Sequence, residues 1–190
     1  MRKLVVVLST FALVAAAAHP ALAQTEEKKF YAGLGFAFGS YDLAANGYSL
    51  ASTYKSNISY YGEFGMHLRP NFAIGVEADY YTKSSNNESI GVWYYNAVGT
   101  YYPSPSPFWI KLLAGYARTS ASGGVGSQGG FDMGLGFGYD WYVKKGVSFA
   151  LVPFVQYLAQ LSGGSFASDP LGTKYESRLF QIGMAFAYEH

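Results

Sequence analysis

Apolar and polar residues alternate with a period of two over most of the chain beyond residue 29. Successive side chains of a β-strand point to opposite faces, so this alternation predicts strands and does not fit a helix. It predicts eight of them, each about as long as a tilted membrane-spanning strand. The predicted strands are Phe30–Tyr41, Ile58–Leu68, Phe72–Tyr81, Ile90–Tyr102, Phe108–Arg118, Phe131–Trp141, Val147–Leu161 and Phe180–Glu189.

Two of these segments are less regular than the others. In Ile90–Tyr102 we assign Asn96 and Thr100 to the polar face, and the aromatic residues Trp93, Tyr95 and Tyr101 to the other face. In Val147–Leu161, Pro153 has no N–H for the strand ladder, so we expect a bulge or a kink there.

The connections between the strands alternate in length. Three are short: Arg69–Asn71, Pro103–Pro107 and Val143–Gly146. The others are longer, polar or rich in glycine: Asp42–Asn57, Lys83–Ser89, Ser120–Gly130 and Ser162–Lys174. Bacterial outer-membrane barrels combine short periplasmic turns with longer extracellular loops. The sequence therefore predicts an all-β fold, an eight-stranded antiparallel up-and-down transmembrane β-barrel, with both termini in the periplasm.

Composition decides which face of the barrel looks outward. Only 13% of the residues are charged, against about 25% in soluble domains. The less apolar face is mostly Gly, Ala and Ser, which suits a narrow lumen better than a hydrated exterior. Aromatic residues gather near both ends of the strands, which predicts two girdles. We place Phe72, Tyr101, Tyr102, Phe108, Trp109, Trp141, Tyr142 and Tyr188 in the periplasmic girdle, and Tyr60, Tyr80, Tyr81, Trp93 and Tyr157 in the other. The large apolar side chains are thus expected to face outer-membrane lipid.

The N-terminus has the three parts of a secretory signal peptide. Met1–Lys3 is positively charged, Leu4–Ala18 is apolar, and Ala21–Ala23 supplies the small residues before a cleavage site. We therefore expect a signal peptide at 1–23 and a barrel domain at 24–190. The net charge of +1 gives no support for a nucleic-acid partner, and the absence of cysteine excludes disulfides and thiolate chemistry.

Several segments resemble the small outer-membrane barrels of the OmpA/OmpX type. They are Gly33–Phe36, Phe72–Glu77, Gly134–Trp141 and the alternating last strand. The resemblance implies recognition by the barrel assembly machinery in the bacterial outer membrane. Such barrels usually end in Phe or Trp in phase with the outward face, whereas this chain ends in His190.

No residues are expected to be catalytic, to bind a cofactor or to ligate a metal. The glycine runs lie inside strands, so a phosphate-binding loop is not expected. A lipid-modifying enzyme would need a histidine within reach of a serine. His67 and His190 are both predicted at the periplasmic end, and neither has a serine at a motif spacing.

Charged residues on the small-residue face should form a polar network in the lumen. They include Glu63, Glu77, Lys111, Asp132 and Asp140. The hairpin around residues 69–71 sets Glu63 opposite Glu77, so the pair shares a proton, keeps one carboxyl protonated through a raised pKa, or has a cation beside it. Lys111 is the candidate cation, but its position along the strand is nearer Asp140.

These features predict a structural or surface-interaction protein that displays extracellular loops and can bind an extracellular ligand through them. Two alternatives remain open at this point: a narrow channel for small solutes and an outer-membrane lipid-modifying enzyme.

Removal of the signal peptide gives the first test. The intact mass of the protein extracted from the membrane should correspond to a chain beginning at Gln24. A full-length precursor recovered from the inner membrane would contradict the barrel interpretation.

Overall fold

The computed structural model describes residues 30–45, 48–49, 56–85, 88–103, 107–122, 125–142, 149–167 and 169–189. The predicted signal peptide at 1–23, the turn Val143–Gly146 and His190 lie outside these residues. Among the described residues, no helix is long and apolar enough to cross a bilayer.

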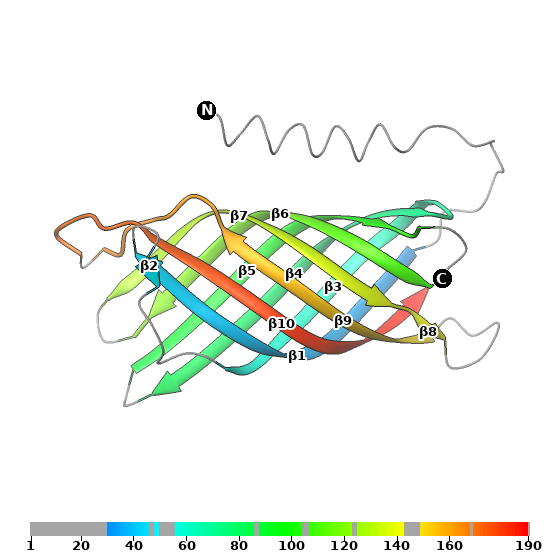
Figure 1. Cartoon of the computed structure of the whole chain (residues 1–190), viewed down its shortest axis with the longest axis horizontal. Coiled ribbons are helices and arrows are strands. Elements are labelled where there is room, and N and C mark those ends of the chain that lie inside the picture. The colour runs from blue at the N-terminus through cyan, green and yellow to red at the C-terminus, as the bar shows by residue number, and fades with distance from the viewer. Residues whose placement is uncertain are drawn as a thin grey trace.

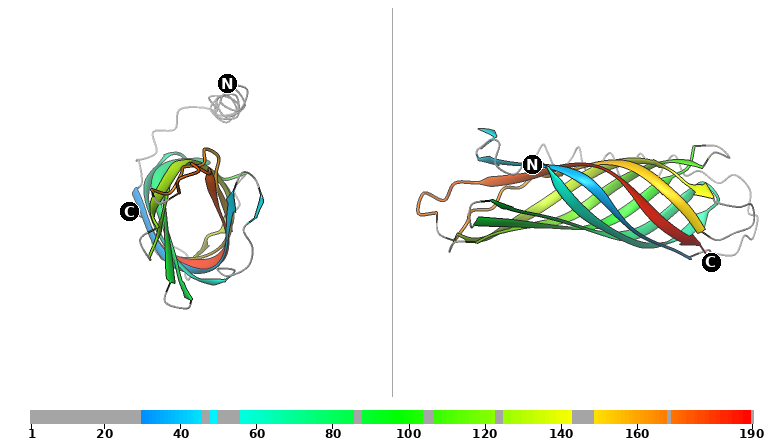
Figure 2. Two further views of the ribbon diagram at one scale, coloured as in Figure 1. Left: turned by 90° about the vertical axis from the view of Figure 1, so that its left-hand side faces the viewer. Right: turned by 90° about the horizontal axis from the view of Figure 1, so that it is seen from below.

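The described chain forms a closed antiparallel β-barrel (Figures 1 and 2). The strands are β1 (Phe30–Ala45), β2 (Tyr48–Ser49), β3 (Asn57–Arg69), β4 (Phe72–Ser85), β5 (Glu88–Tyr101), β6 (Phe108–Ala121), β7 (Gly126–Tyr139), β8 (Trp141–Tyr142), β9 (Phe149–Gln160) and β10 (Tyr175–Glu189). The two-residue β2 pairs only with β1, and β8 continues the pairing of β7 with β9. β10 pairs with both β9 and β1, which closes the ring. Eight strands therefore make up the wall, which confirms the predicted fold class.

The strands are staggered around the ring. A row of paired residues that starts at Ala32 in β1 returns to β10 at Arg178, although Ala32 itself pairs with Tyr188. The row runs through Phe64, Val76, Ala97, Ala114, Met133 and Ala159. The ten-residue offset between positions 178 and 188 is the shear of the barrel, and it requires tilted strands. A row of paired residues therefore rises along the barrel axis, from the short-turn end toward the loop-side end.

The outer wall carries an apolar band of nearly constant height. Its outward residues run from Phe108 to Tyr116 on β6 and from Phe180 to Tyr188 on β10. A tilted strand needs about this length to cross a bilayer. Beyond the band, on the side of the longer connections, the outward residues become small, polar or charged: Ser40, Asp42, Thr82, Ser84, Arg118, Ser120 and Arg178. The loop-side ends of the strands thus extend past the band.

Two predicted loops are largely strand. Ser120–Gly130 was expected to be a long loop, but β6 continues to Ala121 and β7 begins at Gly126. Lys83–Ser89 is likewise mostly taken up by the ends of β4 and β5. The Ser, Thr and Gly residues there pair through their backbones, and such pairing leaves no hydrophobic alternation in the sequence.

Several local expectations were wrong. Trp109, Tyr81 and Tyr102, all assigned to the aromatic girdles, point into the lumen because the alternation of their strands turns them inward. Pro153 marks no bulge, since β9 keeps one register with β10 throughout. The ladder with the preceding strand stops at Phe154 and resumes at Leu151 in the same register, so the proline interrupts hydrogen bonds without displacing the strand. The remaining face assignments are confirmed, including those of Asn96 and Trp93.

The position of the apolar band can be tested with one charge at two heights. Leu135→Arg, at the middle of the band on β7, should lower the free energy of unfolding by about 2–4 kcal/mol. Ser84→Arg, outward but beyond the band, should cost about 0–1 kcal/mol. Urea titrations in lipid vesicles measure both, and equal costs would show that the band has been placed wrongly.

Candidate functional site

A lysine lies between two glutamates near the middle of the lumen. Glu63 on β3 pairs in register with Glu77 on β4, as the hairpin predicts. The Nζ of Lys111, on β6, lies 2.5 Å from Glu63 Oε2 and 2.7 Å from Glu77 Oε2. All three side chains are almost fully buried. Of the possibilities left open by the sequence, the structure shows the one in which a cation lies beside the pair.

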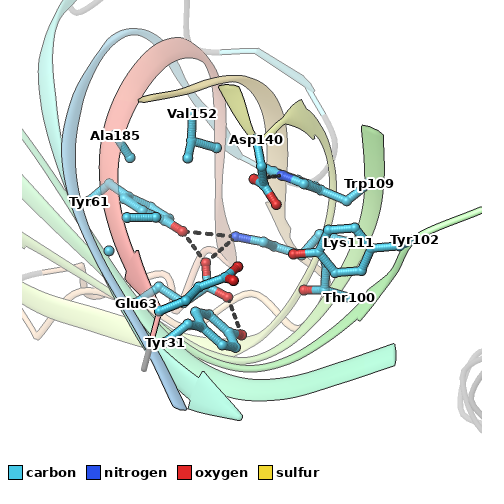
Figure 3. A pocket seen from close by; sticks show the side chains of 13 residues that line it. Tyr31, Tyr61, Glu63, Thr100, Tyr102, Trp109, Lys111, Asp140, Val152 and Ala185 are labelled. Atoms are coloured by element: carbon cyan, nitrogen blue, oxygen red, sulfur yellow. Dashed lines mark hydrogen bonds and ion pairs between the residues drawn. The ribbon is translucent and has the colours of Figure 1, made fainter. Parts of the chain in front are cut away.

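Lys111 reaches Glu63 through the lumen (Figure 3), and its ammonium also donates to Glu77. Its ammonium lies 4.9 Å from the ring centroids of both Tyr61 and Trp109. Gly136, beside it on β7, adds no side chain in its way. Lys111 was expected to lie nearer Asp140. Its ammonium contacts Glu63 and Glu77 instead, so the expectation is wrong for that group. The long, flexible stem of a lysine places the ammonium far from its own backbone.

Two tyrosines complete the environment of Glu63. The hydroxyl of Tyr31 donates to Glu63 Oε1 over 2.7 Å, and the hydroxyl of Tyr61 donates to Glu63 Oε2. Lys111 Nζ also donates to the Tyr61 hydroxyl over 3.0 Å. These tyrosines were not predicted as members of the site. The sequence signal that could have identified them is the alternation along β1 and β3, which points Tyr31 and Tyr61 into the lumen.

Glutamine amides extend the network to further carboxylates. Gln156 Nε2 donates to Glu77 Oε1 over 2.6 Å, and Gln181 Nε2 donates to Asp79 Oδ1 over 2.6 Å. Ser59 Oγ donates in turn to Gln181 Oε1 over 2.8 Å. Burial of a carboxylate is costly unless donors or a cation surround it. One lysine cannot compensate three carboxylates, so the amide hydrogen bonds stabilise Glu77 and Asp79 in the lumen.

Asp132 and Asp140 lie in the lumen but apart from this cluster. Asp132 is fully buried, and neither of its carboxylate oxygens makes a hydrogen bond among the described residues. Asp140 accepts a hydrogen bond of 2.9 Å from Trp109 Nε1 near the end with the short turns. It lines a cavity of about 40 Å³ that also reaches Glu63 and Lys111 (Figure 3). The predicted five-residue network is thus one triad and two separate carboxylates.

Above the triad, the loop-side half of the lumen is mostly apolar. Tyr81, Val92, Leu113, Leu158 and Leu179 form its core. A small polar layer crosses it: the Tyr94 hydroxyl donates to Ser177 Oγ over 3.0 Å, and Gln128 and Gln160 exchange hydrogen bonds of 3.1 and 2.9 Å. Every strand of the wall contributes at least one buried lumen residue. Side chains therefore fill the ring seen in the ribbon of Figure 2.

His67 lies at the end with the short turns, as predicted. Its Nε2 is 3.6 Å from Glu189 Oε1, and its ring packs against those of Tyr31 and Tyr102 at 5.5 and 5.6 Å. None of these partners is a serine.

The comparisons with known proteins agree with this geometry. The outer membrane protein β-barrel domain matches residues 9–183, which is most of the chain. The chain belongs to this family. It is accordingly a protein of the bacterial outer membrane. A search of curated proteins found no match.

The chain is similar to solved structures of other outer-membrane proteins. Neisserial surface protein A is 15% identical, with a TM-score of 0.60 over 86% of this chain and 99% of its own. Ail of Yersinia pestis is 12% identical, with a TM-score of 0.49 over 86% of this chain and 100% of its own. OprG of Pseudomonas aeruginosa is 15% identical, with a TM-score of 0.45 over 86% and 97%. The likeness to Neisserial surface protein A supports a shared fold and, at 15% identity, concerns the fold alone.

The triad can be tested by a double-mutant cycle. Lys111→Met should lower the free energy of unfolding by about 3–5 kcal/mol, because it leaves two buried glutamates without their cation. Lys111→Met combined with Glu77→Gln should cost less than the single change, because one of the uncompensated charges is gone. Equilibrium unfolding in vesicles gives the coupling energy. Strictly additive costs would mean that the three residues do not interact as the distances indicate.

Proposed function

We propose that this barrel is a structural and surface-interaction protein that displays its loop-side hairpins outside the cell. The observation that carries the proposal is the extension of the strands beyond the apolar band at the loop-side end, which the described residues do not show at the other end. At the other end, the described connection between β3 and β4 is a tight turn next to Arg69. Loops presented by a rigid scaffold are where binding usually occurs.

The connection between β9 and β10 is an ordered part of this surface. Asp169 accepts hydrogen bonds from the N–H groups of Leu171 and Thr173, at 2.9 and 3.0 Å, and from the Tyr175 hydroxyl at 3.2 Å. These donors, the Leu171 N–H first, hold the pKa of Asp169 below its usual range. Hydrogen bonding to the charged form explains that direction. The stability that these bonds give the turn is therefore lost as the pH falls through the lowered pKa of Asp169, while the backbone bonds Asp169 N–H to Phe166 O and Gly172 N–H to Asp169 O do not depend on its charge.

An apolar hollow opens beside this loop. Phe166 is buried and packs edge-to-face on Tyr175, with ring centroids 4.9 Å apart. Together with Leu43, Ile90 and Val125 it lines a cavity of about 200 Å³. Ligand sites are usually concave and lined mostly by apolar side chains, so a hollow at this end supports a role in binding.

A binding screen of whole cells tests the proposal. Cells displaying the wild-type barrel should adhere to at least one member of a panel of immobilised glycans and matrix proteins. Replacement of residues 166–173 by Gly-Asn-Gly should abolish this adhesion, whereas His67→Ala, at the opposite end, should not change it. Adhesion that survives the loop replacement would show that the loop is not the interaction surface.

The filled lumen supports this proposal over a narrow solute channel. Buried ion pairs and apolar layers span the described lumen, so ions find no hydrated path. The purified wild-type protein should give no stable single-channel steps in planar bilayers. Reproducible steps would favour the channel instead.

We also propose that the barrel has no enzymatic activity on lipid. A general base must lie within hydrogen-bond reach of its nucleophile, and the contacts of His67 are with Glu189 and two tyrosine rings. His67→Ala should therefore leave the lipid A profile of the cell unchanged in mass spectra. A lost acylation or deacylation product would restore the enzyme hypothesis.

A further inference from the structure

Arg118 is a cation at the loop-side boundary of the apolar band. It is exposed on the outer face of β6, two residues beyond Tyr116, the last aromatic residue of the band on that strand. Arg178 occupies the same height on β10, two residues beyond Phe180. Arg178 lies 3.9 Å from Asp42 and 3.6 Å from Glu176. Arg118 makes no ion pair among the described residues, so its charge is left for another partner.

An aromatic platform adjoins Arg118. Its register partner on β5 is Trp93, whose ring stacks between those of Tyr80 and Tyr95 at centroid distances of 4.4 and 5.5 Å. Trp93 is 39% exposed although it is stacked on both sides. Partners across antiparallel strands have Cβ atoms about 5 Å apart, so the guanidinium and the indole share one patch of surface.

Two glycines make room for the tyrosine side chains of this patch. The partner of Arg118 on β7 is Gly129, and the Tyr116 hydroxyl lies over that glycine, where a Cβ would collide with it. The Tyr80 hydroxyl likewise lies 3.4 Å from the place of a Cβ on Gly91. Both tyrosines therefore turn their hydroxyls toward the loop side, at or near the level of Arg118.

We propose that Arg118, Trp93 and Tyr116 bind the phosphorylated sugar headgroup of an outer-leaflet glycolipid. A guanidinium binds phosphate through two parallel charge-assisted hydrogen bonds. The exposed edge of the Trp93 ring, whose faces pack on Tyr80 and Tyr95, offers apolar contact to a sugar, and the Tyr116 hydroxyl can bond a sugar oxygen. The position of the patch favours a lipid ligand. It continues the apolar band toward the loop side, so it would meet the headgroup of a lipid whose chains lie against Phe131 and Tyr95. This site on the wall is distinct from the loop surface proposed above.

Native mass spectrometry of the folded barrel in non-ionic detergent, titrated with diphosphoryl lipid A, tests the proposal. The wild type should bind one such lipid in preference to the same lipid after removal of its phosphates. Arg118→Gln should weaken binding about tenfold, the loss of one charge-assisted contact. Arg178→Gln is the matched control, at the same height but already paired with carboxylates, and should change binding less than twofold.

Two further measurements separate the role of Arg118 from trivial effects. Circular dichroism and the gel shift between folded and heated samples show that each variant is folded. Trp93→Leu should weaken binding several-fold with the charge intact. Unchanged binding by Arg118→Gln, an equal loss with Arg178→Gln, or equal affinity for the dephosphorylated lipid would overturn the proposal. Complete displacement of the lipid by millimolar inorganic phosphate would also overturn it, since the site would then recognise free anions.

Discussion

The hydrocarbon core of a bilayer offers no water to backbone N–H and C=O groups, and this constraint governs the whole barrel. Pairing of β10 with β1 satisfies it by leaving the sheet without an edge. The ring that results has only eight strands, so its interior is narrow enough to be filled by side chains. Small inward residues such as Gly33 and Gly136 follow from that narrow interior, and Gly138 leaves the room that the inward ring of Trp109 occupies.

Filling the lumen with polar groups creates a second requirement. Glu63, Glu77 and Asp79 are held in a water-poor interior by one lysine and several amide and hydroxyl donors. Such a network is rigid because each loss leaves a charge without its partner. The same network fills the middle of the described lumen and ties together the strands that carry the loop-side hairpins. Lys111 joins β6 to β3 and β4, strands that are not its neighbours in the wall, and is therefore the centre of this arrangement.

The outer surface follows a different rule from the lumen. Within the apolar band, side chains need only be large and apolar, and their sequence order is free. At its loop-side edge the chemistry changes within two residues, from Tyr116 to Arg118 and from Phe180 to Arg178. The two arginines differ in their neighbours: one is paired with carboxylates and the other lies beside an aromatic platform. That difference makes Arg118 a candidate site on the wall.

The sequence by itself determined the strands, their faces and the pairing of Glu63 with Glu77, because alternation and hairpin register are local properties of the chain. It did not show that β6 and β7 continue through Ser120–Gly130, since paired backbones there carry no hydrophobic signal. Only the tertiary structure decided that Lys111 neutralises the glutamates and that Gln181 binds Asp79. These contacts join strands far apart in the sequence, and they depend on shear and on side-chain reach across the lumen, which the alternation pattern does not encode.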